Sequence, residues 1–243
     1  MPDNQLRELI GFQKKVRSAF DWDYRDDLKS AKEIESIFTM KSPYGIDQWS
    51  GQFRNHTLEN ICKELNDAPR VLILGAAIKA QDIIELEKED VAMIVADGAV
   101  GAINNFEKLI CIVSDLDGNP HLDRAALESQ RFIIHAHGDN ITRWKDSMEK
   151  WSNLPSPPEI VLSHQTDDEL QDMYNFGGFT DGDRAVCFAL WAGVNIDKIE
   201  LFGFSTTHVG EWSGSTDKKM KMKKLAWMHR ILSFIGLGDQ VEN

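Results

Sequence analysis

Short aliphatic runs alternate with stretches of helical periodicity from residue 70 to the end of the chain. Six runs are long enough for buried strands and are bounded by Gly, Asp or Pro, namely 70–74, 91–96, 109–114, 131–135, 159–163 and 198–203. Helical spacing of apolar residues occupies the intervals 78–88, 99–107, 122–129, 140–152, 182–193 and 217–235. Because connections of this length form right-handed crossovers, we expect an α/β fold with a doubly wound, mainly parallel Rossmann-like sheet.

Residues 1–66 carry a different pattern. Their apolar residues recur at helical spacing, as in Leu6, Leu9 and Ile10, and no strand-like run interrupts them. We therefore expect an N-terminal helical region over 1–66 and a Rossmann-like domain over 67–243, which would carry any catalysis. The prolines within 155–158 are typical of a loop before a strand rather than of a domain boundary.

Composition narrows the classes of partner. The 243 residues include 27 basic and 39 acidic side chains, and the formal net charge of −12 argues against nucleic acid or an anionic membrane, because both bind cationic surfaces. No run is long enough to span a membrane, and the first residues lack the pattern of a signal peptide, so we expect a cytoplasmic protein. The three scattered cysteines are expected to be buried thiols, and a homodimer is left open.

Acidic motifs follow several of the predicted strands. Asp97 follows VAMIV, Asp115 and Asp117 follow LICIV, HAHGDN (135–140) follows RFII, and TDGDR (180–184) opens a predicted helix. The carboxyl ends of parallel strands meet at one edge of a sheet, where open α/β sheets bind ligands, so these side chains should converge. Since gathered carboxylates repel one another unless a divalent cation lies among them, the sequence predicts Mg²⁺-dependent chemistry on a nucleotide.

Each motif also has a structural interpretation. In an extended segment residues two apart point the same way, so Asp115 and Asp117 can bind one cation, but residues 117–120 (DGNP) are equally typical of a turn. His135 and His137 lack further His or Cys partners for a zinc site, and a contact with phosphate or substrate is the better interpretation.

Of these motifs, GGFTDGDRA (177–185) is the one for which a purely structural role is the least sufficient explanation. Thr180 can cap the following helix, but capping accounts for one acidic residue and not for both Asp181 and Asp183 after two glycines. Arg184 can bind phosphate or pair with a neighbouring carboxylate. The cationic stretch 217–230 is either a solvated helix face or a counter-charge for a triphosphate, and no GxxxxGK[ST] loop occurs.

In this order, ADG, SDLDG, HAHGDN and GGFTDGDRA resemble the archaeal 6-hydroxymethyl-7,8-dihydropterin pyrophosphokinase family, Rossmann-like proteins distantly similar to thiamin pyrophosphokinases. The resemblance covers residues 70 to about 235, and FDWDYRDDLKSAKEI (20–34) resembles the family's N-terminal region. It implies Mg²⁺-dependent transfer of a diphosphoryl group from ATP to the pterin alcohol, with release of AMP. The product would feed tetrahydromethanopterin or folate-type cofactor synthesis.

The resemblance also implies roles for particular residues. Catalytic roles fall to Asp115, Asp117 and Asp181. Ligands of Mg²⁺ are expected from Asp97, Asp115, Asp117, Asp139, Asp181 and Asp183. Contacts with ATP or substrate are expected from Asp97, His137, Asn140, Thr180 and Arg184. Trp212 can stack on a flat ring or simply pack.

Two segments depart from the family pattern, and three alternatives stay open. Residues 75–80 (GAAIKA) replace a Gly-rich loop, and Ser205 stands where relatives often carry Asp. The alternatives are a thiamin pyrophosphokinase-like enzyme, a motility-associated glycosyltransferase that uses Asp-x-Asp for a nucleotide sugar, and a non-catalytic nucleotide-binding module. The compact chain argues against the glycosyltransferase, and the otherwise full acidic set argues against the module.

Overall fold

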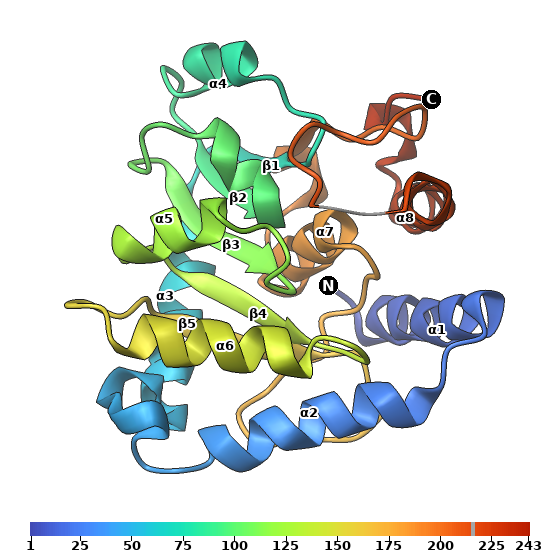
Figure 1. The fold of residues 1–243 in the computed structure, drawn as a ribbon. Coiled ribbons are helices and arrows are strands. Elements are labelled where there is room, and N and C mark those ends of the chain that lie inside the picture. The colour runs from blue at the N-terminus through green and yellow to red at the C-terminus, as the bar shows by residue number, and fades with distance from the viewer. Residues whose placement is uncertain (215–216) are drawn as a thin grey trace.

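A six-stranded parallel sheet organises the molecule, whose computed structural model describes residues 1–214 and 217–243 (Figure 1). Within these residues the strands lie in the order β5-β4-β3-β2-β1-β6, and every neighbouring pair is parallel. They are β1 (Val71–Leu74), β2 (Ala92–Ala96), β3 (Leu109–Ser114), β4 (Phe132–Ala136), β5 (Ile160–His164) and β6 (Ile199–Phe202). The predicted strands and the α/β fold are confirmed, because each apolar run becomes a strand buried between two layers.

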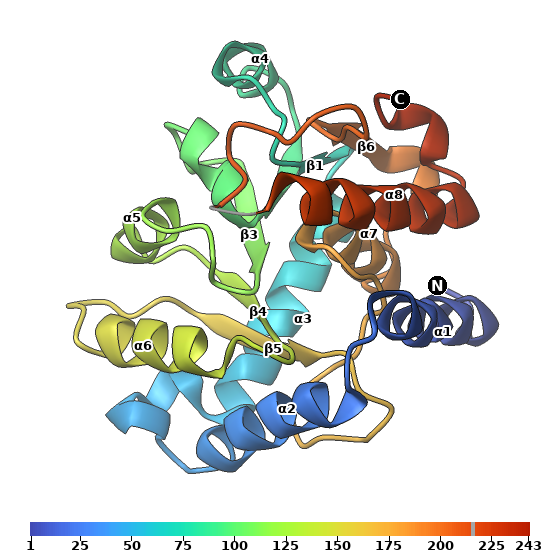
Figure 2. The same cartoon turned by 45° about the vertical axis from the view of Figure 1, so that its right-hand side comes forward.

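Helices cover both faces of the sheet (Figures 1 and 2). One core lies under α2 (Tyr24–Phe38), α4 (Ala80–Leu86), α5 (His121–Leu127) and α6 (Ile141–Ser152). The other lies under α1 (Asp3–Phe20), α3 (Gly51–Asp67), α7 (Asp181–Trp191) and α8 (Lys218–Ile235). Short 3₁₀ helices are η1 (Pro43–Gly45), η2 (Asp47–Trp49), η3 (Asp97–Ala102), η4 (Ile196–Lys198) and η5 (Gly238–Gln240).

The helix predicted over 99–107 is wrong. The chain instead forms η3, a 3₁₀ helix that ends at Ala102. Two glycines weaken a helix here, and both are needed for close packing. A Cβ atom on Gly98 would lie 2.4 Å from the Trp212 carbonyl oxygen, and one on Gly101 would lie 2.5 Å from the Trp212 ring.

Helix α7 lies at the centre of the second core. Its residues from Gly182 to Leu190 are all buried, which explains the nearly unbroken apolar sequence AVCFALW. The N-terminal helices contribute to both cores, Leu9 on the side of α7 and Phe38 on the opposite side. Within the described residues, none of the helices combines the length and the apolar character that crossing a membrane requires.

The order in which the chain adds strands to the sheet reverses at β1. Strands β1 to β5 follow one another across the sheet, and β6 then returns to pair with the free edge of β1. The connections that leave β1 and β6 run to α4 and α8, whose buried residues belong to different cores. A crevice opens at such a point in α/β sheets, at the carboxyl ends of the strands.

Candidate active site

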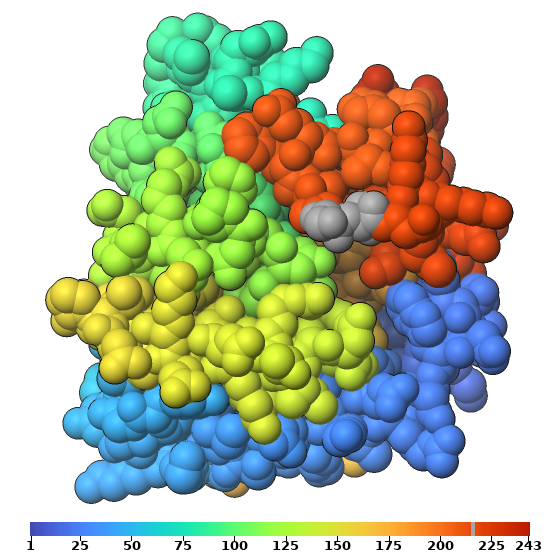
Figure 3. Space-filling model, viewed as in Figure 1, coloured from blue at the N-terminus to red at the C-terminus, as the bar shows by residue number. Residues whose placement is uncertain are grey.

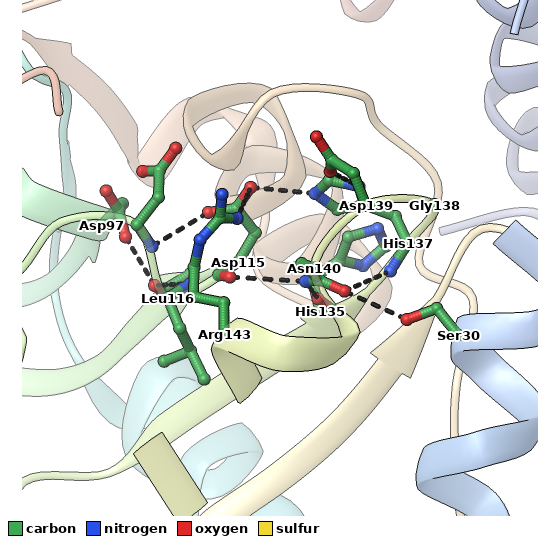
Figure 4. Close-up of polar contacts among 12 residues, drawn as sticks. Ser30, Asp97, Asp115, Leu116, His135, His137, Gly138, Asp139, Asn140 and Arg143 are labelled. Carbon is green, nitrogen blue, oxygen red and sulfur yellow. Dashed lines mark hydrogen bonds and ion pairs between the residues drawn. The ribbon is translucent and has the colours of Figure 1, made fainter. Parts of the chain in front are cut away.

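Three carboxylates gather at the carboxyl edge of the sheet. Asp97 follows β2 directly, and Asp115 and Asp117 belong to the loop after β3. Figure 4 labels Asp97 and Asp115. One carboxylate oxygen from each residue lies within 4.8 Å of the other two. This spacing suits a single hard divalent cation, which binds carboxylate oxygens at about 2.0 to 2.6 Å.

The loop after β3 brings its two carboxylates together by a turn. Leu116 is in the left-handed region, with φ of 71°, so the expectation of an extended Asp-x-Asp segment is wrong. Ser114 holds this conformation, because its hydroxyl oxygen accepts a hydrogen bond from the Leu116 N–H at 2.7 Å. The same hydroxyl donates to Asp97 Oδ1 at 2.5 Å. One serine thus couples the acidic loops after β2 and β3.

Asp181, the first residue of α7, lies close enough to this cluster to be affected by its charge. Burial, and then the charges of Asp115 and Asp117, raise the pKa of Asp181 to about 7. Burial and the same group of carboxylates, Asp181 foremost, raise the pKa of Asp97 well above its ordinary value. With a pKa of about 7, Asp181 retains its proton in part at neutral pH and would release it when a cation binds.

Asp115 differs from these two because cationic groups surround it (Figure 4). His137 Nε2 lies 2.8 Å and Arg143 Nη1 lies 3.5 Å from Asp115 Oδ2. Burial acts to raise its pKa, but the hydrogen bond and charge of His137, with Arg143 and Lys224, outweigh burial and hold the pKa well below its usual range. Asp115 is therefore the member of the cluster that stays ionised at any pH of interest.

Asn140 makes hydrogen bonds that hold the site together. Its amide nitrogen donates to the carbonyl oxygens of His135 at 2.6 Å and Asp115 at 3.3 Å. Its amide oxygen accepts from His137 N at 3.1 Å and Ser30 Oγ at 3.0 Å, as Figure 4 shows. Since the side chain is fully buried and makes four hydrogen bonds, its role is to position the loops after β3 and β4 against α2.

Two of the acidic candidates lie apart from the cluster. The Asp139 side chain is 83% exposed, and its carboxylate contacts His137 Nδ1 at 3.4 Å. Asp183 is buried and caps α7, accepting hydrogen bonds from Phe179 N at 2.6 Å, Thr180 N at 2.8 Å and the Thr180 hydroxyl. The cap therefore uses Asp183, while Asp181 is left facing the cluster.

Two cavities meet at Asp181. The larger, of about 390 Å³, is bounded by the α1–α2 turn, the loops after β3 and β4 and the start of α8, and Figure 3 shows the hollow between these segments. The smaller, of about 60 Å³, lies at the ends of β1 and β6 and is lined by Gly75, Gly203 and Trp212. Thr180, Asp181 and Lys221 line both cavities, so a ligand that extends from one to the other passes the carboxylates.

Arg184 and Trp212 are found on different sides of this site. Arg184 is buried beside the larger cavity, where its Nε donates to the Phe179 carbonyl at 3.1 Å and its Nη2 donates to Gln165 Oε1. Trp212 borders the smaller cavity, and its indole N–H donates to the Ile78 carbonyl at 2.9 Å. Trp212 therefore fastens the segment after β6 onto the 75–80 loop.

Several residues at the site were not singled out individually from the sequence. Lys221 and Lys224 extend from α8 to the larger cavity, and the cationic stretch 217–230 was the signal for them. Ser114 and Asp27 gave no signal, because a serine at a strand end and an aspartate within a polar helix are both common. Asp27 accepts hydrogen bonds from Gly138 N at 2.9 Å and from a glutamine side chain at 2.7 Å.

Comparison with known proteins finds three archaeal relatives that share one name. The chain is 29% identical to the 6-hydroxymethyl-7,8-dihydropterin pyrophosphokinase of Methanocaldococcus jannaschii, over 98% of this chain and 97% of that protein. It is 33% identical to the protein of the same name from Pyrococcus furiosus, over 92% and 91% of the two chains. The namesake from Methanothermobacter thermautotrophicus is 33% identical over 60% of this chain and 64% of its own. No family model matches the sequence.

Proposed function

Because this chain belongs to the 6-hydroxymethyl-7,8-dihydropterin pyrophosphokinase family, we propose that it transfers a diphosphoryl group from ATP to 6-hydroxymethyl-7,8-dihydropterin and releases AMP. The observation that carries the proposal is the triad of Asp97, Asp115 and Asp117, with an oxygen of each within 4.8 Å of the others, at the edge where such sheets bind nucleotides. The product would serve the synthesis of tetrahydromethanopterin or a folate-type cofactor in the cytoplasm.

We assign Mg²⁺ to Asp97, Asp115 and Asp117, whose donors are the hard oxygens that this ion prefers. When bound, the ion would supply positive charge to the phosphoryl oxygens. Asp181 would contribute to the same cation or to its water ligands. Asp139 is left out of the set because its side chain is exposed and directed to His137.

The remaining residues would orient the reactants. Lys221 lines both cavities, so its ammonium group is suited to the phosphates that must pass between them. His137 and Arg143 keep Asp115 ionised and in place. In the transfer, the hydroxymethyl oxygen would form a bond to the β-phosphorus of ATP, the bond from that phosphorus to the α–β bridging oxygen would break, and the alcohol proton would pass to solvent. Positioning and neutralisation of charge dominate such a step.

An assay of product identity tests the proposal. Purified protein is incubated with ATP, Mg²⁺ and one acceptor at a time: 6-hydroxymethyl-7,8-dihydropterin, thiamin, or a nucleotide sugar with a protein acceptor. The expected result is AMP and pterin diphosphate in equal amounts, abolished by EDTA. Formation of ADP with a pterin monophosphate, or turnover of thiamin alone, would contradict the proposed reaction.

A further inference from the structure

The larger cavity has an aromatic wall that the transfer chemistry at the carboxylates leaves unused. Trp22, in the turn between α1 and α2, is 39% exposed and stacks on Phe20 with ring centres 4.7 Å apart. Phe179 joins this wall, with its ring centre 6.0 Å from that of Trp22. A partly exposed tryptophan supported from behind by a second ring offers a fixed flat surface to a planar ligand.

The lining of the same cavity includes a buried acceptor atom. Ser163 Oγ donates to the Ile134 carbonyl at 3.2 Å, so it accepts from His135 Nδ1 at 3.2 Å. This arrangement assigns the imidazole proton to Nδ1, which leaves a lone pair on Nε2. Within residues 1–214 and 217–243, His135 Nε2 has no hydrogen-bond partner although it is buried, and His135 lines the cavity. An unpaired buried acceptor costs stability unless a ligand donor meets it.

The charge of the larger cavity favours a neutral ligand over an anionic one. Eight aspartates line it, against three basic residues, Arg184, Lys221 and Lys224. The smaller cavity has only Asp97 and Asp181 against Lys221. A triphosphate laid along the larger cavity would meet strong repulsion, whereas an uncharged heterocycle would not. Since adenine brings its triphosphate with it, the charge balance favours the glycine-lined side at the ends of β1 and β6 for the phosphates of the nucleotide.

Lys224 connects the aromatic wall to the reacting centre. Its ammonium nitrogen lies 5.4 Å from the centre of the Trp22 ring, and its charge also lowers the pKa of Asp115. Because Phe20 stacks on Trp22, a ligand ring on the Trp22 surface would take the place of this ammonium group and lie within one side chain of the carboxylates. A short substituent on that ring, such as a hydroxymethyl group, is enough to reach the phosphates.

We propose that the larger cavity is the acceptor site, in which a neutral bicyclic 2-amino-4-oxo heterocycle stacks on Trp22 and donates a ring N–H to His135 Nε2. This assignment rests on the proposed function for the identity of the acceptor. The pyrimidine edge of such a heterocycle carries two neighbouring N–H donors, which match the His135 lone pair and the buried Asp27 carboxylate in the same lining. Asp27 already accepts from Arg17, Gly138 and Gln165, which leaves one of its four lone-pair sites for a ligand donor. His135 is in this view a positioning residue that sets specificity and takes no part in the transfer itself.

The decisive experiment compares Trp22→Leu with Trp227→Leu, a control in α8 that lines neither cavity. Trp22→Leu should raise KM for the pterin alcohol roughly tenfold or more, while KM for ATP stays within about twofold. Trp227→Leu should change neither. A rise in KM for ATP with the pterin KM unchanged would assign the cavity to adenine, and no change in either KM would show that the wall is not used; both results overturn the proposal.

Equilibrium binding separates this inference from the proposed function. The intrinsic fluorescence of 6-hydroxymethylpterin, titrated with wild type and with Trp22→Leu, reports binding without turnover. Binding that weakens in the variant, in a protein that transfers nothing to any pterin, would refute the reaction and leave the acceptor site standing. Turnover of the pterin with binding unaffected by Trp22→Leu would refute the site alone.

His135 is tested in the same titration. His135→Leu should weaken binding of 6-hydroxymethylpterin about tenfold to a hundredfold, while His135→Gln, which retains an acceptor oxygen, should recover part of the loss. An N3-methylated pterin, which lacks the ring donor, should bind wild type and His135→Leu about equally. Equal binding of the unmethylated pterin by a His135→Leu protein that melts like wild type would overturn this contact. If His135→Leu does not fold, the Trp22 comparison decides.

Discussion

Replacement of Asp181 by asparagine should stabilise the protein in the absence of metal and at the same time abolish most of its activity. Asp181 begins α7 and lies among like charges, whereas the cap of the helix is made by Asp183. Loss of the Asp181 charge therefore removes repulsion without removing the cap. A residue that served only the helix terminus would behave in the opposite way, because loss of a capping residue costs about 1 kcal/mol.

The magnitude follows from the pKa of Asp181, which burial and the charges of Asp115 and Asp117 raise to about 7 from the ordinary 3.8. At about 1.4 kcal/mol for each factor of ten, this difference corresponds to about 4 kcal/mol. The carboxylate lines a cavity open to water, so we expect about 1 to 2 kcal/mol of it to be realised. For a chain of this length that is a rise in melting temperature of roughly 2 to 8 °C.

The pH dependence of folding stability tests independently whether loss of the Asp181 charge stabilises or destabilises the protein. Below about pH 4, Asp181 is protonated in the folded and unfolded states and its charge costs nothing. Between about pH 4 and 7, only the unfolded state ionises, so wild type loses stability as pH rises, and above the folded-state pKa of about 7 the loss is complete. Asp181→Asn lacks this titration, so its advantage over wild type should grow from pH 4 to 7 and then stay constant.

Thermal melts in EDTA at pH 5, 6, 7 and 8 measure this advantage, with Asp139→Asn as a control because its carboxylate is exposed. Addition of Mg²⁺ and ATP should raise the melting temperature of wild type and much less that of Asp181→Asn. Turnover by the variant should fall about a hundredfold. A variant that melts lower than wild type at pH 8, yet turns over normally, would show that Asp181 is merely a helix-terminal residue.

Three further predictions concern the same edge of the sheet. Asp115→Asn and Asp117→Asn should each reduce turnover about a hundredfold or more, and normal turnover in both would remove the metal assignment. Asp115→Asn should also lower the melting temperature, because His137 and Arg143 lose their carboxylate partner. Affinity for Mg²⁺ by calorimetry should weaken up to tenfold per pH unit below about pH 7, where Asp181 takes up its proton; an affinity equal at pH 6 and 8 would contradict this. Asn140→Ala should lower the free energy of unfolding by about 2 to 4 kcal/mol in denaturant melts, because the buried carbonyl of His135 loses its partner; a change below about 0.5 kcal/mol would refute the bridging role.

The fold could be predicted from the sequence because the strands are buried on both faces of the sheet, and this burial dominates the hydrophobic pattern. Every apolar run became a strand, since a strand between two helical layers admits few polar residues. The prediction failed over 99–107, where periodicity resembled a helix but Gly98 and Gly101 are required for contact with Trp212. That contact joins segments more than a hundred residues apart, and no local pattern reports it.

The convergence of the acidic loops was predictable, but the roles of individual residues were not. Sequence order places Asp181 and Asp183 two residues apart at one helix start, and either could cap. The structure separates them because the carboxylate of Asp183 turns back to the N–H groups of Phe179 and Thr180. Likewise Asn140 resembles a ligand contact in the string HAHGDN, yet its hydrogen bonds join three chain segments that are distant in sequence.

The conformation of Leu116 explains how the protein holds the carboxylates after β3 in place. A branched residue with φ of 71° is strained by an amount of order 1 to 3 kcal/mol, and such strain persists only where the surroundings compensate for it. Here the Leu116 side chain is buried in the core and its N–H is held by Ser114, so packing and a hydrogen bond fix the turn. The carboxylates of Asp115 and Asp117 are thereby held near Asp97 by the protein itself. The repulsion among them is built in during folding, so the site would be preorganised for the proposed cation, and binding of that cation would relieve the repulsion.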